Sequence, residues 1–349
     1  MSRHPLYVAR IKERYALTKP GSTKATYHIV LDLQGCPFSF KVGDSLGIYP
    51  HNDPLIVERW LSRLEVAGET QITDSRSGQM MSLESFLAEK ANLGRVTPKL
   101  AEVLSYTGPL DIDPLEILRP MAAQELVSLL APLLPRFYSV ASSLIVHPNE
   151  AHLTVVLSTY EYQGEIRYGV ASHFLCHLAI PYVTPILCYV QPAAHFTIPA
   201  ESHLDLIMIG PGTGVAPFRA FMQERLALSA TGNHWLFFGE RHRATDFLYE
   251  DFWMELSQQN KLRLDLAFSR DQAEKVYVQH KMEENAAEIW DWISRGAYTY
   301  LCGEADPMAK EVEQTLLKIF EIHGNLSTEA ARLFLKTLRK EKRLLADVY

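Results

Sequence analysis

The sequence predicts two successive domains, a β-rich domain interrupted by a helical block and an α/β domain with a doubly wound parallel sheet. Three observations support this fold class: β-branched and aromatic runs early in the chain, helical periodicity over about 54–131, and regular strand–helix alternation afterwards. A chain of 349 residues is long enough for two domains with separate cores. We expect the boundary near Pro199, which gives domains of residues 1–198 and 199–349.

The first domain is predicted from runs that are rich in Val, Ile, Thr and Tyr and are bounded by Gly, Pro and Asp. These predicted strands are residues 25–33, 41–50, 152–160 and 184–192. Between them, residues 54–131 repeat their apolar residues at helical spacing, as in PLIVERWLSRLEVAG. A helical block between two β blocks indicates an insertion into a barrel-like β-domain.

The second domain is predicted from four apolar strands that each precede an amphipathic helix. The strand–helix units are residues 204–230, 234–259, 262–296 and 297–324. Repeated strand–helix units form parallel sheets with helices on both faces, because each crossover connection is right-handed and lies against the sheet. Ligands of such sheets bind beyond the carboxyl ends of the strands, so the residues that follow each strand are the candidates for a site.

Composition narrows the class of protein. A net charge of −7 argues against nucleic acid as the main partner, since nucleic-acid binding needs clustered positive charge. No apolar run is long enough for a membrane helix, and the start of the sequence has no apolar signal core, so we expect a cytoplasmic protein without a membrane span. The four cysteines form no CxxC pair and the thirteen histidines show no ligand spacing, so no metal is expected.

The segment IGPGTGVAPFRAF carries the clearest local signal. An apolar strand runs into Gly210, Gly212 and Gly214, and a helix with Pro217 in its first turn follows. Glycines let the backbone approach a phosphate closely, and a helix N-terminus offers free N–H groups. The spacing GxGxG differs from the usual GxGxxG, so a tight turn without a ligand stays open as an alternative.

A second polar segment follows the strand at residues 262–268. It holds hydroxyl, cationic and amide side chains that suit the 2′-phosphate of NADP, namely Ser269, Arg270, Lys275, Tyr277 and Gln279. Glu240, which ends another strand, is the rival, because an acid there binds a ribose 2′-hydroxyl and would indicate NAD. Five polar candidates for a 2′-phosphate against one acid favour NADP over NAD. For the polar segment itself, a solvated loop without a ligand is the other interpretation.

Two further segments suit a phosphorylated aromatic cofactor. In PRFYSVASS, alternation along a strand places Arg136 and Tyr138 on one face and Ser139 on the other. In YGVASHFLCHL, Gly169 and Ser172 stand at a helix entry where a pyrophosphate could bind. From the residues alone, an ordinary strand edge and a capped helix remain the alternatives, and Cys302 would most simply fill a core.

Taken in order, the motifs RFYS, GVAS, IGPGTGVAPFRAF, FSRDQAEKVYVQHK, YLCGEADPMAKEVE and the terminal DVY resemble the ferredoxin–NADP reductase module of the diflavin reductases. The flavoprotein subunits of NADPH–sulfite reductases are the most similar branch. The resemblance spans nearly the whole chain. It implies an antiparallel β-barrel domain for FAD with the helical insertion, followed by the NADP domain.

The resemblance also implies the site residues. FAD would be bound by Arg136, Phe137, Tyr138, Ser139, Thr154, Val155, Val156, Tyr160, Gly169, Val170, Ala171, Ser172 and Tyr349. NADPH would be bound by Gly212, Thr213, Ser269, Arg270, Lys275, Val276, Tyr277, Val278, Gln279 and Glu311. Ser139, Cys302 and Asp347 match positions that assist hydride transfer. Tyr349 matches an aromatic residue that covers the flavin and must move aside for the nicotinamide.

Two departures from the family pattern are visible. Glu311 stands where close relatives carry Asp, which keeps the charge. The family usually has an N-terminal flavodoxin-like FMN domain, whereas this sequence starts at the reductase part, so FMN is not expected in this chain.

The resemblance implies that hydride passes from NADPH to FAD and that electrons then pass to a protein acceptor, either a separate FMN or flavodoxin-like protein or a haem protein subunit. A stand-alone flavodoxin or ferredoxin reductase and a non-catalytic structural subunit are the alternatives.

Overall fold

The computed structural model describes residues 5–36 and 39–349, and the chain forms two compact units that are interleaved in the sequence. The first unit comprises residues up to Ile11, Gly47–Phe137 and Leu157–Tyr189, and the second comprises Lys12–Leu46, Tyr138–Val156 and Val190–Tyr349. The boundary expected from the sequence, between 1–198 and 199–349, stays a prediction. Residues 1–4 and 37–38 belong to that expected first domain and lie outside the described residues.

A six-stranded sheet forms the β-rich part of the chain and has the order β6-β3-β10-β1-β2-β7. Its strands are β1 Tyr7–Ala16, β2 Thr26–Asp32, β3 Ser45–Tyr49, β6 Arg136–Ser139, β7 Glu150–Val156 and β10 Ile186–Gln191. β1 pairs antiparallel with β10, and β2 pairs antiparallel with β7. Directly after β6, Val140 forms an antiparallel bridge to Leu153 of β7, so the first and last strands of the order are joined. This closure confirms the barrel-like β-domain that the sequence predicts.

The predicted helical insertion lies between β3 and β6 in the chain. It consists of α1 Pro54–Leu64, β4 Gln71–Thr73, β5 Met80–Ser82, α2 Leu83–Glu89, α3 Pro98–Val103, α4 Pro114–Ile117 and α5 Ala123–Leu129. α1 begins where the sequence indicates, because the Asp53 carboxylate accepts the Leu55 N–H at 2.9 Å and Pro54 needs no N–H partner. Trp60, Phe86 and Leu126 are fully buried and give the insertion a core of its own.

Between β7 and β10 the chain forms a hairpin and a short helical segment. These elements are β8 Thr159–Tyr162, β9 Glu165–Tyr168, α6 Val170–His173 and a π-helical turn at Phe174–Leu178. β8 and β9 pair antiparallel with each other in a separate two-stranded sheet.

The second unit contains a five-stranded parallel sheet with the order β13-β12-β11-β14-β15. Its strands are β11 Leu206–Ile209, β12 His234–Glu240, β13 Arg263–Phe268, β14 Tyr298–Gly303 and β15 Leu344–Val348. Four of them match the predicted strand–helix units. The fifth, β15, was not predicted: it pairs in parallel with β14, so the C-terminus becomes an edge strand of the sheet.

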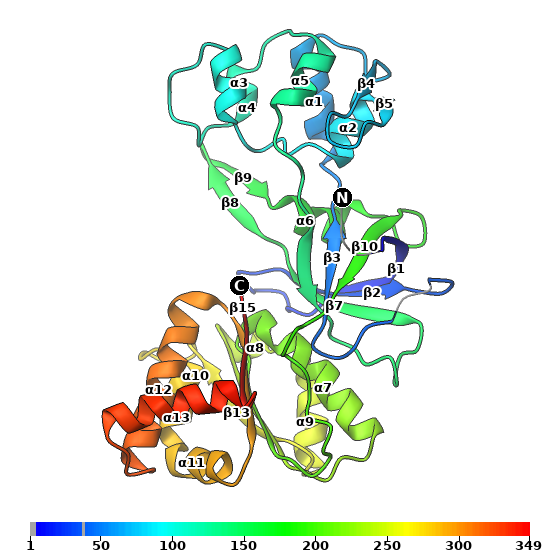
Figure 1. Ribbon diagram of the computed structural model, residues 1–349. Coiled ribbons are helices and arrows are strands. Elements are labelled where there is room, and N and C mark those ends of the chain that lie inside the picture. The colour runs from blue at the N-terminus through cyan, green and yellow to red at the C-terminus, as the bar shows by residue number, and fades with distance from the viewer. Residues whose placement is uncertain (1–4, 37–38) are drawn as a thin grey trace. The chain divides into compact units, whose positions relative to one another are not determined.

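Helices cover both faces of this parallel sheet (Figure 1). They are α7 Ala216–Ala227, α8 Arg243–Asp246, α9 Glu250–Gln258, α10 Val278–Glu284, α11 Ala286–Ser294, α12 Lys310–Ile322 and α13 Thr328–Lys340. Because side chains alternate along a strand, Met208 and Phe238 enter the core under α7 and α9. Ile209 and Phe237 enter the core under α10–α13 on the other face. Two buried faces confirm the doubly wound architecture.

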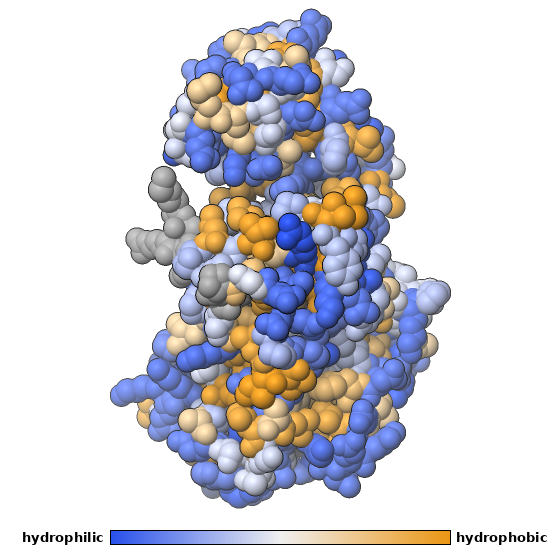
Figure 2. Space-filling model, turned by 90° about the vertical axis from the view of Figure 1, so that its right-hand side faces the viewer, coloured by the Kyte–Doolittle hydropathy of each residue, from blue (hydrophilic) through white to orange (hydrophobic). Residues whose placement is uncertain are grey.

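Among the described residues, none of the helices has both the length and the apolar character needed to cross a bilayer. On the face drawn in Figure 2, hydrophilic residues cover most of the surface and apolar residues gather in a few patches between them.

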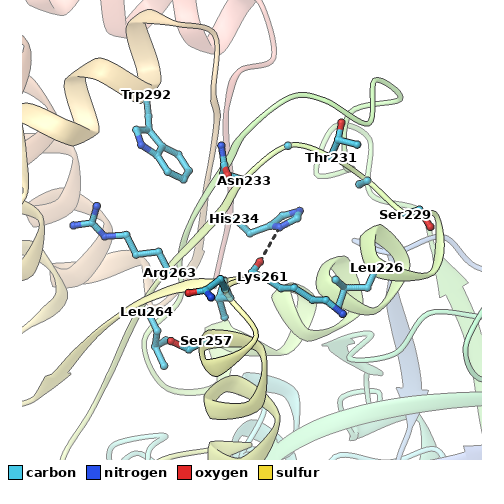
Figure 3. Close-up of a pocket in the computed structure, with 14 residues that line it drawn as sticks. Leu226, Ser229, Thr231, Asn233, His234, Ser257, Lys261, Arg263, Leu264 and Trp292 are labelled. Atoms are coloured by element: carbon cyan, nitrogen blue, oxygen red, sulfur yellow. Dashed lines mark hydrogen bonds between the residues drawn. The ribbon is translucent and has the colours of Figure 1, made fainter.

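His234 illustrates how the second unit buries polar groups at the start of β12. Its Nδ1 lies 3.1 Å from the Lys261 carbonyl, to which it donates, and its Nε2 accepts from Arg225 Nε at 3.1 Å (Figure 3). The ring is 5% exposed. Burial, and next the Arg225 charge, lower the pKa of His234 from 6.5 to about 4, so the folded protein holds the neutral imidazole.

Acid should therefore destabilise the second unit through His234. Between pH 6.5 and about 4, His234 binds a proton in the unfolded chain but not in the folded chain, so the free energy of unfolding falls as the pH drops. The loss is about 3 kcal/mol at most. Below about pH 4 both states are protonated, and the contribution of His234 no longer changes. Urea unfolding followed by tryptophan fluorescence measures the slope. His234→Asn should flatten it, whereas the same change at exposed His323 should not. Equal slopes for the wild type and His234→Asn would contradict the assignment.

Candidate functional site

The carboxyl ends of the five parallel strands meet at one edge of the sheet, which we call the cofactor edge. It is formed by the residues at or directly after the ends of β11, β12, β13, β14 and β15, namely Gly210, Glu240, Ser269, Gly303 and Tyr349. The chain order reverses between β11 and β14, since β12 and β13 lie on one side of β11 and β14 and β15 on the other. A crevice at such a reversal is where open α/β sheets bind ligands.

The glycine-rich turn after β11 lies at this reversal. It forms a 3₁₀ turn, Gly212–Val215, that leads into α7 with Pro217 in the first turn of the helix. A β-carbon at Gly214 would stand 2.0 Å from the Cys302 carbonyl oxygen, so only glycine fits there. Gly212 has φ 58°, a left-handed conformation that glycine adopts without strain. The bare backbone at the start of α7 suits the phosphates of a dinucleotide.

β14 and β15 bring the predicted catalytic residues together. Cys302 and Asp347 are paired positions of the two parallel strands, so their side chains lie on the same face of the sheet. Ser139 Oγ donates to Asp347 Oδ2 at 3.1 Å across 208 residues of sequence. The structure therefore places Ser139, Cys302 and Asp347 in one cluster within the second unit.

Burial shifts the pKa values of two members of the cluster, Cys302 and Asp347, upward. Burial, and next the Asp347 charge, raise the pKa of the Cys302 thiol well above its usual value. Burial also raises the pKa of Asp347, against the opposing effect of the Ser139 hydrogen bond. A thiol in this environment serves as a neutral group of low polarity rather than as a nucleophile.

The terminal Tyr349 is held at both its backbone and its hydroxyl. Its N–H donates to the Gly303 carbonyl at 3.1 Å, and its carbonyl accepts from Ala305 N at 3.0 Å. Its hydroxyl lies 2.7 Å from Thr213 Oγ1 in the glycine-rich turn. The residue as a whole is 65% exposed, while burial raises the pKa of its hydroxyl to about 12, so Tyr349 is anchored at its hydroxyl and open elsewhere. A fixed aromatic ring with an open face can stack on another ring.

The predicted 2′-phosphate residues lie along the loop after β13. Ser269 is tied to the end of β12, since its N–H donates to the Glu240 carbonyl at 2.9 Å. Arg270, Lys275 and Tyr277 are exposed. Their side chains are therefore open to a ligand, which is what a phosphate contact requires.

The other predicted NADP residues differ in exposure. Val278 is buried and contacts the strand end at Gly239, whereas Val276 is half-buried beside the core under α10–α13. Gln279 Nε2 donates to Glu311 Oε2 at 2.6 Å, so these two candidates lie together. Within the described residues, the Gln279 amide thus already has a partner.

Glu240, the acid whose position in the sequence would indicate NAD binding, has partners for both of its carboxylate oxygens. Its Oε1 forms an ion pair with Lys24 Nζ, and its Oε2 accepts the Arg241 N–H at 2.7 Å. Sequence reasoning missed Lys24 and Arg241. Arg241 could have been found because it directly follows a strand end, but nothing in the sequence connects Lys24 with a residue 216 positions away.

The RFYS motif forms β6, as the sequence predicts. Arg136 and Phe137 are exposed, and Phe137 meets the Tyr189 ring edge-on with 6.1 Å between ring centroids. Tyr138 and Ser139 are half-buried. An exposed cation beside aromatic rings fits the proposed contacts with a flavin and its phosphates, and the assignment stays a prediction.

The GVAS motif forms the tight entry to α6. Ser172 Oγ donates to the Gly169 carbonyl at 3.0 Å and accepts the Ser158 N–H at 3.0 Å. Val170 is half-buried and Ala171 is buried. Because the Ser172 hydroxyl closes this turn, we expect any pyrophosphate to meet the backbone of the loop rather than that hydroxyl.

The remaining predicted FAD residues divide by exposure. Thr154 is buried and its Oγ1 lies 2.6 Å from the Tyr249 hydroxyl, and Val155 is buried beside it in β7. Val156 is half-buried, whereas Tyr160 is 52% exposed on β8. A side-chain contact with a ligand is therefore open to Tyr160, while Thr154 and Val155 would have to contribute through their backbone.

A cluster of His147, Glu150 and His152 brings three potential metal ligands together, with all three ligand atoms within 4.8 Å of one another. Both ring nitrogens nearest the carboxylate face Glu150 Oε2, at 3.5 Å from His147 and 2.9 Å from His152. The opposite nitrogens face donors, Gln223 Nε2 and Arg219 Nη1. These partners fix the tautomers, with the N–H of each ring pointing toward Glu150. A metal ion beside Glu150 would need an unprotonated nitrogen there, so the three residues form a hydrogen-bonded cluster.

A pocket of 780 Å³ lies at the opposite edge of the parallel sheet (Figure 3). It is lined by the first residues of β12 and β13, His234 and Arg263, and by Trp292 of α11. The amino ends of parallel strands are not where doubly wound sheets bind cofactors, so this pocket is separate from the cofactor edge.

Comparison with known proteins finds two domain matches in the chain. Residues 1–90 and 117–174 match the FAD binding domain, and residues 208–314 match the oxidoreductase NAD-binding domain. The unmatched stretch 91–116 falls inside the helical insertion. The matches confirm the two-domain architecture and the FAD and NAD(P) modules expected from the sequence.

The curated relatives match the chain over nearly its whole length. The sulfite reductase [NADPH] flavoprotein alpha-component of Shewanella sp. (strain MR-7) is 40% identical over 370 residues, covering 98% of this chain and 61% of the relative. The proteins of the same name from Bacillus subtilis (strain 168) and from Vibrio cholerae serotype O1 (strain ATCC 39315 / El Tor Inaba N16961) are 38% and 37% identical, covering 100% of this chain and 62% and 60% of the relatives. The chain thus spans about three-fifths of the length of the relatives that it matches.

Proposed function

We propose that this chain, which combines the FAD-binding and NAD-binding modules of the ferredoxin–NADP reductase-like flavoproteins, oxidises NADPH through FAD and passes the electrons to a redox protein. The observation that carries the proposal is the cofactor edge. There the glycine-rich turn, Cys302, Asp347 and Tyr349 converge from β11, β14 and β15, and Ser139 joins them by its bond to Asp347. A structural subunit without redox chemistry would need none of these contacts.

NADPH would be held by groups of the second unit. The turn at Gly212 and Thr213 offers its backbone to the phosphates, and the exposed side chains of Arg270, Lys275 and Tyr277 are available to a 2′-phosphate. FAD would be held by residues of β6, of the loop at 169–172 and of β8, with Tyr349 stacking on the flavin.

When bound, these cofactors supply the chemistry, which is hydride donation from nicotinamide to flavin and release of single electrons to the acceptor. The chain orients the groups that assist. Asp347 accepts the Ser139 hydroxyl proton in a hydrogen bond and so fixes where that hydroxyl points. The Cys302 thiol stays neutral and so adds no negative charge beside Asp347, and the Tyr349 ring would shield the flavin from water.

The acceptor is proposed as a protein, either a separate FMN or flavodoxin-like protein or a haem protein subunit. The support is that the relatives are named as flavoprotein components of sulfite reductase, a name that implies a further component in those assemblies. A cytoplasmic location likewise stays a proposal that rests on the sequence.

The proposal is tested by purifying the chain with added FAD and measuring NADPH oxidation with ferricyanide as an artificial acceptor. A yellow protein that oxidises NADPH much faster than NADH supports the proposal. A colourless protein that takes up no FAD and leaves NADPH unoxidised would refute it.

Arg270→Ala should lower kcat/KM for NADPH about 10- to 100-fold, because a charge-assisted hydrogen bond to a phosphate is worth about 1.5–3 kcal/mol. Since NADH has no 2′-phosphate, its kcat/KM should not change. Steady-state ferricyanide assays measure both values. Arg332→Ala, which removes an exposed arginine from α13, is the matched control. An unchanged preference for NADPH in Arg270→Ala would show that the 2′-phosphate binds elsewhere.

Deleting Tyr349 should change the absorption spectrum of bound FAD and weaken the discrimination between NADPH and NADH, because the exposed ring would no longer cover the flavin. Tyr349→Phe separates the ring from its hydroxyl, which contacts Thr213, and should keep the spectrum of the wild type. If the deletion leaves both the spectrum and the discrimination unaltered, Tyr349 only anchors the end of β15.

A further inference from the structure

We propose that Lys24 makes the cofactor edge compatible with NADP(H) by neutralising Glu240. The inference rests on the proposed function and deepens it, because it assigns a specificity role to a residue outside the predicted NADP-binding segments. Glu240 is the one acid that the sequence sets against NADP. Whether Glu240 favours NAD(H) over NADP(H) depends on which groups its carboxylate contacts.

The Glu240 carboxylate lies directly beside the glycine-rich turn. A β-carbon built at Gly212 would stand 3.5 Å from Glu240 Oε1. The side chain of Glu240 is only 6% exposed, so water does little to screen its charge. Left alone, this carboxylate would repel the phosphates of any dinucleotide at the turn, and the additional 2′-phosphate of NADP(H) would make the repulsion greater for NADP(H) than for NAD(H).

Lys24 compensates the negative charge of the Glu240 carboxylate. Its ammonium group forms an ion pair with Glu240 Oε1, while Glu240 Oε2 accepts the Arg241 N–H. Each carboxylate oxygen thus already accepts from a donor, so Glu240 is a weaker acceptor for a ribose 2′-hydroxyl, the contact by which an acid at a strand end selects NAD. The same ion pair that cancels the repulsion therefore also weakens the feature that would favour NAD.

The loop that carries Lys24, residues 18–24, belongs to the second unit and is anchored to the rest of it at several points. Lys19 N–H donates to the Thr245 carbonyl at 2.8 Å, and Ser22 Oγ donates to Asp246 Oδ1 at 2.5 Å. Ser22 Oγ also accepts the Lys24 N–H at 3.0 Å. Arg241 Nη1 donates to Thr23 Oγ1 at 2.6 Å. These bonds hold the segment that leads into Lys24, so the ammonium group is directed at Glu240 rather than free on the surface.

The proposal is tested by isothermal titration calorimetry of the FAD-loaded protein with NADP⁺, NAD⁺ and 2′,5′-ADP. Lys24→Met should weaken binding of NADP⁺ and 2′,5′-ADP about 10- to 50-fold, as expected for an unpaired charge roughly 7 Å from a phosphate at an effective dielectric constant of about 20. Binding of NAD⁺ should weaken less. Lys24→Met/Glu240→Gln should restore NADP⁺ binding toward that of the wild type, because the double variant leaves no charge to repel.

Restored NADP⁺ binding in the double variant distinguishes neutralisation of Glu240 by Lys24 from a direct contact between Lys24 and a phosphate. If Lys24 acted by binding a phosphate itself, the double variant would stay as weak as Lys24→Met, and that result would overturn the proposal. Lys19→Met is the matched control, since Lys19 lies in the same loop and pairs with Glu250 instead. Equal NADP⁺ affinity in Lys24→Met and the wild type would also overturn the inference and leave the proposed function standing. A wild type that binds neither dinucleotide would refute both.

Discussion

The parallel pairing of β15 with β14 is the interaction on which the site depends. It sets Asp347 opposite Cys302 and carries Tyr349 to the Gly303 carbonyl, where its hydroxyl reaches Thr213 of the glycine-rich turn. The turn is fixed against the same strand, because Gly214 leaves no room for a side chain beside the Cys302 carbonyl. A five-residue strand at the end of the chain therefore completes the edge of a sheet and a candidate active site at once.

Burial and ion pairing reduce the negative charge at the cofactor edge. The thiol of Cys302 is kept neutral, the pKa of Asp347 is raised, and Glu240 is neutralised by Lys24. Buried charges need a partner, and the two partly buried acids Asp347 and Glu240 have one each, Ser139 and Lys24. The arrangement leaves the exposed cations Arg270 and Lys275 as the charged groups most open to an anionic ligand along the loop after β13. Such a balance suits a polyanionic dinucleotide.

Local patterns in the sequence predicted the parts of the fold whose signals are local. The strand–helix units, the helical insertion and the glycine-rich turn follow from periodicity and from turn residues, and the structure confirms them. Interactions between distant segments could not be predicted, because a five-residue strand such as β15 has no clear signal until its partner strand is known. The bond between Ser139 and Asp347 and the ion pair between Lys24 and Glu240 span more than 200 residues, so only the folded chain reveals them.

The central claim is that β14 and β15 assemble a hydride-transfer site at the cofactor edge. Anaerobic stopped-flow mixing of the FAD-loaded protein with NADPH, followed by the absorbance of oxidised flavin, tests it most directly. The account predicts complete bleaching in the wild type and a rate lowered by about 10-fold or more in Asp347→Asn with FAD content unchanged. Reduction of Asp347→Asn at the rate of the wild type, or a wild-type flavin that NADPH does not bleach, would contradict it.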